Sequence, residues 1–440
     1  MKTIIRPETE MKDSGVEWIK YVPENWNCMP LKRYFQFGKG LPITKADLTE
    51  NGEKVISYGQ IHAKFNTGVS VDDRLIRFVS SEYKSTNPNS LCSKGDIILA
   101  DTSEDKEGCG NAVYIDCDEK IFAGYHTIIL KSTKDNKYLA YLFQSDSWRT
   151  QIQTRVNGVK LFSITQKILN QCTIILPPLS EQQAIADYLD ETCSKIDEII
   201  AEAKASIDEY KELRESVISN ATTRGIKKNR SMKSSGVEWL PEIPADWNVL
   251  SPKVVFTQRK DRAIKGERQL TASQKHGIMY QDDYMKEEGV RIVTVEKDFS
   301  ILKHVEPDDF VISMRSFQGG LEYSYLRGCI SSAYVMLIPN HKYVYSEYYK
   351  WFFKSDKYIN ALQSTSDLIR DGQALRYANF VKLKLFDIPI EEQKEIADYL
   401  NKEVPKIDSL ITEKESLIND LEAYKKSLIY EVVTGKRRVV

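Results

Sequence analysis

The amino-acid sequence predicts an α+β protein in which two globular, mixed α/β domains are separated by two long antiparallel coiled-coil helices, with an internal pseudo-twofold repeat. Three observations predict this fold class. The length of 440 residues exceeds the size at which a single hydrophobic core usually stops growing. The decapeptide EQQAIADYLD at 181–190 returns as EQKEIADYLN at 392–401, with seven identities. Each decapeptide opens a run of apolar residues spaced by three and four, which is typical of a coiled coil.

The repeat extends over the chain in a constant order. Three further segment pairs carry it: MKDSGVEWIKYVPENWN at 11–27 with MKSSGVEWLPEIPADWN at 232–248, KGDIILADTS at 94–103 with PDDFVISMRS at 307–316, and YLAYLFQSD at 138–146 with YYKWFFKSD at 348–356. The copies match closely at the edges of each half and weakly in the middle, as expected of one framework that carries two different inserts. We therefore divide the chain into a first segment with its globular domain, a first helical region, a second segment with its globular domain, and a second helical region with the C-terminal tail, at 1–178, 179–225, 226–389 and 390–440.

The two helical regions are predicted to pair through one apolar face each. We expect the interface to contain Ile196, Ile200, Ile207, Tyr210 and Val217 from the first region and Ile407, Ile411, Leu417, Leu421 and Leu428 from the second. Pro405 interrupts the second pattern, and a proline inside a helix costs about 3 kcal/mol. The second region is therefore predicted to form a short helix around 391–402 and a long helix that starts near Pro405.

The two inserts are predicted to be domains rich in β-strands. Strand-like runs are DIILA, AVYID and HTIILK in the first insert and VRIVTV, DFVISM and AYVMLIP in the second, separated by Gly, Asn and Asp turns. One helix is expected near 137–154 and its counterpart near 345–362. Each insert spans about 150 residues, the usual size of one domain.

The formal net charge of -1 conceals a segregation of charge along the chain. Residues 180–222 hold 4 basic and 11 acidic side chains, and residues 390–434 hold 6 and 11. Residues 31–176 hold 19 basic and 16 acidic side chains, and residues 251–386 hold 21 and 16. Because phosphate binding depends on Lys and Arg, the mildly basic globular blocks are better candidates for nucleic-acid contact than the acidic helices.

The chain shows no signal for a membrane or an oxidising compartment. No apolar run is long enough to cross a bilayer, and the start MKTIIRPETEMKD lacks the apolar stretch of a signal peptide. We therefore expect a cytoplasmic protein without a membrane partner. The seven cysteines are scattered and show no CxxC spacing, which favours reduced thiols over disulfides or a zinc site.

Catalytic motifs are weak. The chain has no GxxxxGK[ST] phosphate loop, and its five histidines show no HxxxH or HExxH spacing. Asp73, Glu82 and Lys84 resemble the acidic and lysine cluster of magnesium-dependent nucleases. Such a spacing also arises by chance in a charged surface loop, so we expect neither a catalytic residue nor a metal site in this chain.

Loops of the two basic blocks combine cations with amide, hydroxyl and imidazole groups. Arg and Lys recognise guanine edges, Asn and Gln recognise adenine, and Lys and Ser also hold phosphates. The predicted DNA-binding residues are Lys39, Thr44, Lys45, Tyr58, Gln60, His62, Lys64, Thr102, Ser103, Arg155, Asn157 and Lys160 in the first block and Ser273, Gln274, Lys275, His276, Arg315, Ser316, Gln318, Arg370, Gln373 and Arg376 in the second. For any single loop, an ordinary polar turn is the alternative.

The helices suggest a fixed spacing between two binding sites. A helix of about 30 residues spans roughly 45 Å at 1.5 Å per residue. Antiparallel helices of that length would hold the two basic domains apart in inverted orientation, and sites one turn of duplex apart are separated by about 34 to 36 Å. We therefore expect a fused pseudo-dimer that reads two different half-sites separated by a fixed gap.

The order of these elements resembles the specificity (S) subunits of type I restriction-modification enzymes. The resemblance covers nearly the whole chain and rests on the two SGVEW segments, on PPLSEQQAIADYLD and IPIEEQKEIADYLN, and on the VTGK tail. YGQIH, ADTSED and AGYHT resemble one subtype of recognition domain, and SQKHG with MRSFQGG resembles another. The resemblance implies a non-catalytic subunit whose two target-recognition domains bind a bipartite, asymmetric site in double-stranded DNA.

The same resemblance implies that the helical regions recruit two methyltransferase (M) subunits and, where they exist, restriction (R) subunits. S-adenosylmethionine for adenine methylation would belong to M, and ATP with Mg²⁺ would belong to R, so this chain would carry no cofactor. From the residues alone, two other functions stay open. One is a coiled-coil adaptor whose globular domains bind proteins, and the other is a stand-alone nuclease that uses Asp73, Glu82 and Lys84.

Overall fold

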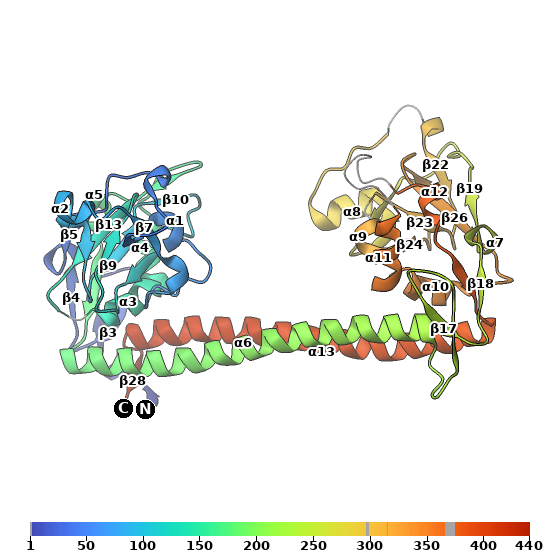
Figure 1. Cartoon of the computed structure of the whole chain (residues 1–440). Helices are drawn as coiled ribbons and strands as arrows, with labels where there is room; N and C mark the ends of the chain where they lie inside the picture. The colour runs from blue at the N-terminus through green and yellow to red at the C-terminus, as the bar shows by residue number, and fades with distance from the viewer. Residues whose placement is uncertain (1, 135, 296–298, 315, 366–374) are drawn as a thin grey trace. The chain divides into compact units, whose positions relative to one another are not determined.

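The computed structural model describes the chain apart from residues 1, 135, 296–298, 315 and 366–374 (Figure 1). The chain divides into two units, Met1–Ala203 with Leu417–Val440 and Lys204–Ser416. Two long helices, α6 (Leu179–Arg224) and α13 (Ile390–Val433), each contribute to both units. Each unit therefore contains one globular domain and part of each long helix. This combination of mixed α/β domains with two long helices confirms the predicted fold class.

The globular domain of the first unit contains two four-stranded sheets. The antiparallel sheet has the order β11-β9-β13-β5, from β5 (Gln36–Lys39), β9 (Ile97–Ala100), β11 (Ala112–Tyr114) and β13 (Thr127–Lys131). The mixed sheet has the order β7-β6-β12-β8, from β6 (Glu53–Ile56), β7 (Arg77–Val79), β8 (Leu91–Cys92) and β12 (Ile121–Ala123), in which β6 and β12 are parallel. Isoleucine and valine side chains of these strands, with Phe122, form the core between them.

Four strand pairs and five short helices complete the first unit. The pairs are β1 (Thr3–Ile5) with β28 (Arg437–Val439), β2 (Met11–Asp13) with β3 (Tyr21–Pro23), β4 (Asn27–Pro30) with β15 (Thr173–Leu176), and β10 (Thr102–Ser103) with β14 (Phe162–Ser163). The helices are α1 (Tyr58–Ile61), α2 (Tyr83–Thr86), α3 (Lys137–Gln144), α4 (Asp146–Gln153) and α5 (Gln166–Leu169). The β1·β28 pair brings the two ends of the chain side by side (Figure 1).

The second unit is built around one antiparallel sheet with the order β19-β26-β23-β24. Its strands are β19 (Phe256–Arg259), β23 (Phe310–Ile312), β24 (Glu322–Tyr323) and β26 (Val335–Pro339). Strand pairs are β16 (Met232–Ser234) with β17 (Glu242–Pro244), β18 (Asn248–Leu250) with β27 (Leu385–Asp387), β20 (Leu270–Ser273) with β21 (Gly277–Tyr280), and β22 (Lys303–Val305) with β25 (Gly328–Ile330). The helices are α7 (Pro252–Val255), α8 (Gln281–Glu288), α9 (Ser316–Gly319), α10 (Ser346–Phe352), α11 (Asp356–Ser364) and α12 (Tyr377–Phe380).

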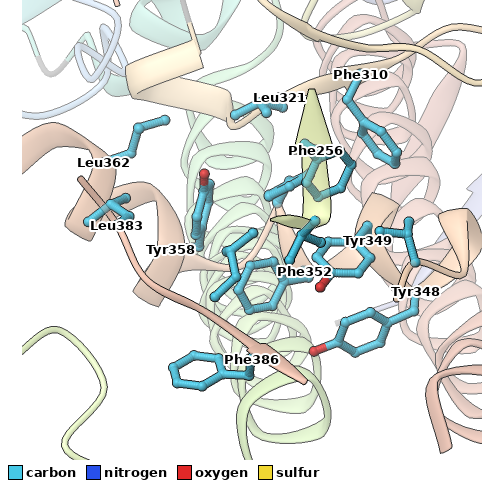
Figure 2. Packing of buried hydrophobic residues seen from close by; sticks show 14 of the residues in the cluster. Phe256, Phe310, Leu321, Tyr348, Tyr349, Phe352, Tyr358, Leu362, Leu383 and Phe386 are labelled. Atoms are coloured by element: carbon cyan, nitrogen blue, oxygen red, sulfur yellow. The ribbon is translucent and has the colours of Figure 1, made fainter. Parts of the chain in front are cut away.

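An aromatic core fixes the second globular domain onto its helices. Figure 2 shows Phe256, Phe310, Tyr349 and Phe352 gathered in one cluster. Ile218 and Ala221 of α6 and Ile396, Ala397, Leu400 and Val404 of α13 belong to the same buried cluster. Aromatic pairs gain about 0.5 to 1.5 kcal/mol beyond the area that they bury. The domain and the adjoining helix segments therefore share one core.

Two predictions about the globular domains are wrong. The single helices expected at 137–154 and 345–362 are each two helices, α3 with α4 and α10 with α11. The breaks lie at Ser145 and Ser355, whose hydroxyls donate to the carbonyls of Leu142 and Phe352 at 2.6 and 2.7 Å. The run VRIVTV at 290–295 is not a strand. It follows the left-handed Gly289 that ends α8, and its Val293 is 90% exposed, so no sheet or core covers it.

The helix predicted to break at Pro405 is continuous. α13 runs from Ile390 to Val433 with Pro405 inside it. Proline cannot donate the hydrogen bond to the carbonyl four residues earlier. Val404 and Leu400, both fully buried next to this point, keep the helix packed against the core of the second unit. Tertiary packing therefore outweighs the local cost of the proline.

The apolar face between the long helices is largely as predicted, with one wrong residue. Ile196, Ile200, Ile207, Ile407 and Leu428 are buried, and Tyr210, Val217, Ile411 and Leu421 are half-buried. Leu417, however, is 39% exposed, whereas Ile418 beside it is only 8% exposed. The heptad steps run 407, 411, 414, 418, 421, 425, 428 and pass through half-buried Lys414 and Lys425. Because two lysines occupy this face, the spacing of apolar residues alone predicted Leu417 at the interface in place of Ile418.

Equivalent ion pairs link the long helices in each unit. Arg214 Nε donates to Asp408 Oδ1 at 2.7 Å in the second unit. Lys425 Nζ donates to both oxygens of Asp197 at 2.7 Å in the first unit. The acidic members are 211 residues apart, and so are the basic members, which is the interval of the repeated decapeptide. A charged position on a coiled-coil face fixes register, so both units specify the same alignment of the helices.

The glutamate that opens each decapeptide forms the same buried contact in both units, which we call the anchor cluster. In the first unit, Trp26 Nε1 donates to Glu181 Oε2 at 3.0 Å, and Arg6 Nη2 donates to Glu181 Oε1 at 2.7 Å. In the second unit, Trp247 Nε1 donates to Glu392 Oε2 at 3.3 Å. Arg230 Nη2 donates to the same oxygen at 2.8 Å, and its other terminal nitrogen bonds Glu392 Oε1. The anchor cluster explains why the tryptophan and the glutamate recur in the sequence.

A second repeated contact connects each globular domain with the end of a long helix. The Tyr138 hydroxyl donates to the carbonyl of Val433 at 2.8 Å, and the Tyr348 hydroxyl donates to that of Thr222 at 2.6 Å. These tyrosines lie at matching positions of the repeat, as do the two carbonyls. Burial raises the pKa of both tyrosines well above the usual value, so both stay neutral donors. The framework is thus repeated at the level of single hydrogen bonds.

Candidate nucleic-acid interface

Four predicted binding residues of the first domain, Tyr58, His62, Thr102 and Ser103, gather around α1 together with His126, and we call these five residues the Tyr58 surface. α1 begins after Ser57, whose backbone N–H donates to Gln60 Oε1 at 3.2 Å in a capping box. The Tyr58 ring lies 5.6 Å from the Tyr125 ring and 5.2 Å from the His126 ring, between centroids. The predicted segments YGQIH, ADTSED and AGYHT therefore meet at one place.

His62 holds this surface together. Its Nε2 donates to the Thr102 carbonyl at 2.8 Å, and its Nδ1 accepts from Asn111 Nδ2 at 3.0 Å. Asn111 Oδ1 in turn accepts from Arg149 Nη1 at 2.5 Å. These partners assign a neutral imidazole with its proton on Nε2. Because both ring nitrogens are engaged, His62 fixes β10 against α1 rather than presenting a free group to a base.

His126 is the residue of this surface that the sequence reasoning missed. It adopts a left-handed backbone with φ 56°, and its Nδ1 lies 3.4 Å from Asp101 Oδ1 and from Thr102 Oγ1. A non-glycine residue in this conformation costs of order 1 to 3 kcal/mol and tends to occur at functional sites. In the sequence, His126 reads as the first residue of the strand HTIILK, which gives no signal of this geometry.

The hollow beside Tyr58 and His62 is acidic. It has a volume of about 540 Å³ and is lined by Glu104, Asp105, Glu107 and Arg149. Burial lowers the pKa of Arg149, whose guanidinium is occupied by Asn111 and, at 3.0 Å, by Gln144 Oε1. Carboxylates repel phosphate but accept hydrogen bonds from base amino groups. The hollow itself is therefore not a phosphate site, and phosphates would be held by the cations around it.

The remaining predicted residues of the first domain fall into two groups. Three are used inside the fold: the Thr44 hydroxyl donates to Asp47 Oδ2 at 2.9 Å, Arg155 Nη1 donates to the Gln151 carbonyl at 2.5 Å, and Gln60 caps α1. The hydrogen bonds from Thr44 lower the pKa of Asp47. The other group is exposed, and within the part of the chain that the structure describes none of its side chains has a hydrogen bond or ion pair: Lys39, Lys45, Lys64, Asn157 and Lys160.

In the second domain, the predicted turn SQKHG is bound to α8. Lys275 Nζ and His276 Nε2 lie 2.9 and 2.8 Å from Glu288 Oε1, and the two side chains lower the pKa of that carboxyl. The Ser273 hydroxyl accepts from the backbone N–H groups of Lys275 and His276 at 3.3 Å each. The positive charge of this turn is thus offset by an acidic neighbour, which the sequence reasoning did not foresee.

The second predicted loop lies against the first one. Gln274 packs on Gly319 of α9, where an added Cβ would come within 2.8 Å of the Gln274 amide nitrogen. Ser316 is buried, and its hydroxyl accepts from the Ser313 N–H at 2.8 Å, whereas Gln318 is exposed. Arg376 precedes α12 with an exposed side chain. Three further predicted residues lie outside the described residues: Arg315, Arg370 and Gln373.

The residues proposed for a nuclease do not form a site. Lys84 Nζ pairs with Glu53 Oε1 at 2.8 Å, and Glu82 and Asp73 are exposed on different short helical turns. Among the residues that the structure describes, no three His, Cys, Asp or Glu side chains are placed to hold a metal ion. Burial raises the pKa of Cys109, Cys193 and Cys329 to about 11, so these thiols are poor nucleophiles.

No helix in the described part of the chain is both long enough and apolar enough to cross a membrane. α6 and α13 have the length, but charged residues occur throughout both.

Comparison with known proteins gives one consistent family. Residues 23–209 match the family model described as type I restriction modification DNA specificity domain. Two specificity subunits of type I restriction enzymes from Methanocaldococcus jannaschii, MjaX and MjaVIII, are each 24% identical over 95% of this chain and over 95% and 94% of their own length.

Solved structures show the same fold. A chain from a structural study of complex assembly and conformational transition in the type I R-M system superposes with a TM-score of 0.68 at 14% identity, covering 94% of this chain and 99% of that one. The HsdS subunit from Thermoanaerobacter tengcongensis gives 0.52 at 13% identity, covering 94% and 98%. Along nearly its whole length, and in the order of segments found in the sequence, the chain is similar to the specificity subunits of type I restriction enzymes.

Proposed function

We propose that this chain is the DNA-recognition subunit of a cytoplasmic type I restriction-modification complex. Each globular domain is a target-recognition domain that reads one half of a bipartite, asymmetric site in double-stranded DNA. The long helices set the gap between the half-sites and recruit two methyltransferase subunits and, where they exist, restriction subunits. The chain itself has no catalytic role.

One observation carries this proposal: the framework contacts repeat while the surface loops do not. The anchor cluster and the tyrosine contacts hold each globular domain on the long helices in the same way. The Tyr58 surface has no sequence counterpart in the second domain, where Lys275 and His276 contact Glu288 instead. A framework that presents two different surfaces in equivalent positions suits recognition of two different sequences.

The chemistry of the first surface supports DNA contact in two tiers. Lys39, Lys45, Lys64 and Lys160 are exposed and unpaired within the described residues, so they can bind phosphate without first breaking an ion pair. The acidic hollow beside Tyr58 presents hydrogen-bond acceptors, which suit amino groups on base edges. Phosphate contacts would position the domain, and base contacts would supply specificity.

The partners supply the chemistry in this proposal. S-adenosylmethionine is bound by the methyltransferase subunits, and ATP and Mg²⁺ by the restriction subunits, so this chain needs no cofactor. The acidic faces of α6 and α13 disfavour DNA and suit contact with protein. Helices with that role would keep the partners on the framework and leave the globular domains for DNA.

The salt dependence of DNA binding tests the proposal. The chain is purified with its methyltransferase partner, and its affinity for duplex DNA that contains its site is measured over a range of salt concentrations. We expect Lys39→Ala and Lys160→Ala each to reduce the slope of log K against log salt by about 1. Lys195→Ala on α6, where Lys195 pairs with Glu191, is the matched control and should leave the slope unchanged. Binding that does not depend on salt would instead favour a protein adaptor.

A further inference from the structure

A basic cavity occupies the first unit at the end of its antiparallel sheet opposite to the Tyr58 surface. It has a volume of about 570 Å³, and Arg33, Lys94, Lys131 and Lys134 line it together with one carboxylate, Asp96. We call it the Arg33 pocket. The pairing of β13 with β5 shows its position: Ile128 pairs with Lys39 at the end near His126, and Lys131 pairs with Gln36 at the pocket. The pocket is thus separate from the proposed DNA surface.

The cations of the Arg33 pocket are available to a ligand. The Arg33 side chain is exposed and has no hydrogen bond or ion pair with any residue that the structure describes. Lys134 lies over the Tyr34 ring, at 5.8 Å from its centroid, and its side chain has no hydrogen bond or ion pair with the residues described in the structure. Lys94 pairs at 3.3 Å with Asp118, but both side chains are largely exposed, and such a pair contributes little.

The other two charges of the pocket are committed to the fold. Lys131 Nζ donates to the carbonyls of Asn89 and Leu91 at 2.9 and 3.1 Å. Asp96 Oδ2 accepts from the Ser93 N–H at 2.9 Å, and Asp96 is buried. The rim therefore presents three cations to solvent, Arg33, Lys94 and Lys134, and among the described residues that line the pocket no carboxylate is exposed.

The framework does not require these cations. In the second unit the framework around the equivalent place repeats: Phe35 lies 6.3 Å from Phe143, and the matching rings Phe256 and Phe353 are 5.4 Å apart. The equivalents of two of the three rim cations, Arg33 and Lys94, are nevertheless the uncharged residues Val254 and Pro307, and the equivalent of Lys131 is Ile338. The second unit therefore lacks the counterparts of Arg33 and Lys94.

The lining decides which kind of anion fits. Met29, Leu91 and Leu176 give the pocket an apolar floor, and the Tyr34 ring lies beside them. A glutamate or aspartate side chain can place its carboxylate on the rim cations while neighbouring aliphatic groups cover that floor. A sugar-phosphate backbone offers no apolar groups of this kind, and the proposed DNA surface lies at the other end of the sheet.

We propose that the Arg33 pocket binds an acidic polypeptide segment of a partner protein, one segment per chain. This inference depends on the proposed function in one respect: the proposed function assigns DNA to the opposite end of the sheet. Because the second unit lacks the counterparts of Arg33 and Lys94, the two halves of the chain are not equivalent to this partner. The framework of the chain is repeated, but this docking site would occur once, in the first unit.

The test measures binding of a fluorescein-labelled peptide of six Glu-Ala repeats to the full chain by anisotropy. We expect the triple variant R33A/K94A/K134A to weaken binding about tenfold, as three partly exposed charge contacts should. K32A/K253A/K342A removes three exposed lysines outside the pocket and should change affinity by less than about twofold. R33K/K94R/K134R keeps the charge and should retain binding, while unchanged thermal unfolding shows that each variant is folded.

Several results would overturn the proposal. One is that wild-type chain does not bind the peptide, and another is that the two triple variants lose affinity equally. A third is that an unlabelled duplex displaces the peptide and that R33A/K94A/K134A weakens duplex binding, which would make the pocket part of a nucleic-acid surface. If Lys39→Ala weakens duplex binding and leaves peptide binding unchanged, the DNA surface and the Arg33 pocket are distinct sites. The failure of one proposal can then be told from the failure of the other.

Discussion

At the scale of single residues, the two units use matching contacts made by different side chains. The Tyr141 hydroxyl donates to Asp190 Oδ1 at 2.6 Å in the first unit, and Trp351 Nε1 donates to Asn401 Oδ1 at 2.9 Å in the second. The donors lie at equivalent positions of the repeat, and so do the acceptors. A donor on α3 or α10 and an acceptor on a long helix are thus kept although both residue types changed.

The anchor cluster makes Arg230 a strongly stabilising residue. We expect Arg230→Ala to destabilise the second unit by about 3 to 5 kcal/mol, because Glu392, whose side chain is 2% exposed, keeps only the more distant Lys227, at 3.9 Å, as a cation. Hydrogen exchange of the peptides that cover α10 and α13 measures the loss locally. Arg268→Ala is the control, since Arg268 pairs with Asp282 and Asp283 at the surface and should cost less than about 1 kcal/mol. Equal effects of both substitutions would contradict the anchor.

A like-charged pair in the second unit makes its stability depend on pH. Lys426 Nζ lies 3.1 Å from Asp146 Oδ1 in the first unit, and the equivalent pair in the second unit is Glu215 with Asp356. Burial, and then the Asp356 carboxyl, raise the pKa of Glu215 above its usual value. The folded state therefore favours protonated Glu215, and this contribution is lost as the pH rises through the raised pKa.

We expect Glu215→Gln to stabilise the second unit at neutral pH and to have no effect near pH 4, where the carboxyl is protonated in wild type. The gain should be about 0.2 to 1 kcal/mol because the pair is mostly exposed. Thermal unfolding at both pH values measures it. Lys426→Glu should create the same pH dependence in the first unit, and a gain from Glu215→Gln that is equal at both pH values would contradict the explanation.

Residue types alone could not assign roles within the candidate site. Thr44, Gln60 and His62 were predicted as DNA contacts because their side chains can bind bases, but the structure uses them as caps and as a link between β10 and α1. The same hydrogen-bonding groups serve both purposes. Only the hydrogen-bond partner of a side chain decides between the two roles. The hydrogen-bond partner of His62 is Asn111, which lies 49 positions away in the chain.

At the scale of elements, the long helices were predictable because their periodicity extends over many turns. The errors occurred where a charged or rigid residue interrupts the pattern. Lys414 and Lys425 lie on the paired face, and their apolar stems pack while their charges reach solvent or Asp197. Pro405 lies on the exposed side of α13, where burial of its neighbours keeps the helix intact. Neither case can be decided from the spacing of apolar residues.

The corrected face of α13 leads to a direct comparison of two neighbouring residues. Ile418→Ala should cost about 2 to 4 kcal/mol, because it removes a buried side chain from the contact between the helices. Leu417→Ala should cost less than about 1 kcal/mol, since Leu417 is largely exposed. Denaturant unfolding of the full chain, followed by helix signal, compares the two. A larger loss for Leu417→Ala would restore the face predicted from the sequence.

Short strands and helices were less predictable than the long helices. VRIVTV has the composition of a strand, but it has no partner strand and no core to cover it. The breaks at Ser145 and Ser355 depend on hydroxyls that compete with the backbone for the carbonyls of the preceding turn. Burial and local side-chain bonding, rather than propensity, decide such cases.

At the scale of the whole molecule, the duplication separates what is constant from what varies. The framework of anchor clusters, tyrosine contacts and helix ion pairs repeats bond by bond. The Tyr58 surface and the Arg33 pocket occur in the first unit without a counterpart of the same sequence in the second. The fold could be inferred from the repeat alone, whereas the surfaces could not, because they are the parts that did not repeat.

The most direct test of the central claim, that one framework carries two different DNA readers, is methylome sequencing of cells that express the chain with its methyltransferase partner. We predict an asymmetric, bipartite motif with a fixed gap. Inserting one heptad after Lys204 and after Glu415 should retain both half-sites and lengthen the gap by about three base pairs. A single continuous motif, or methylation that does not change when this chain is absent, would contradict the account.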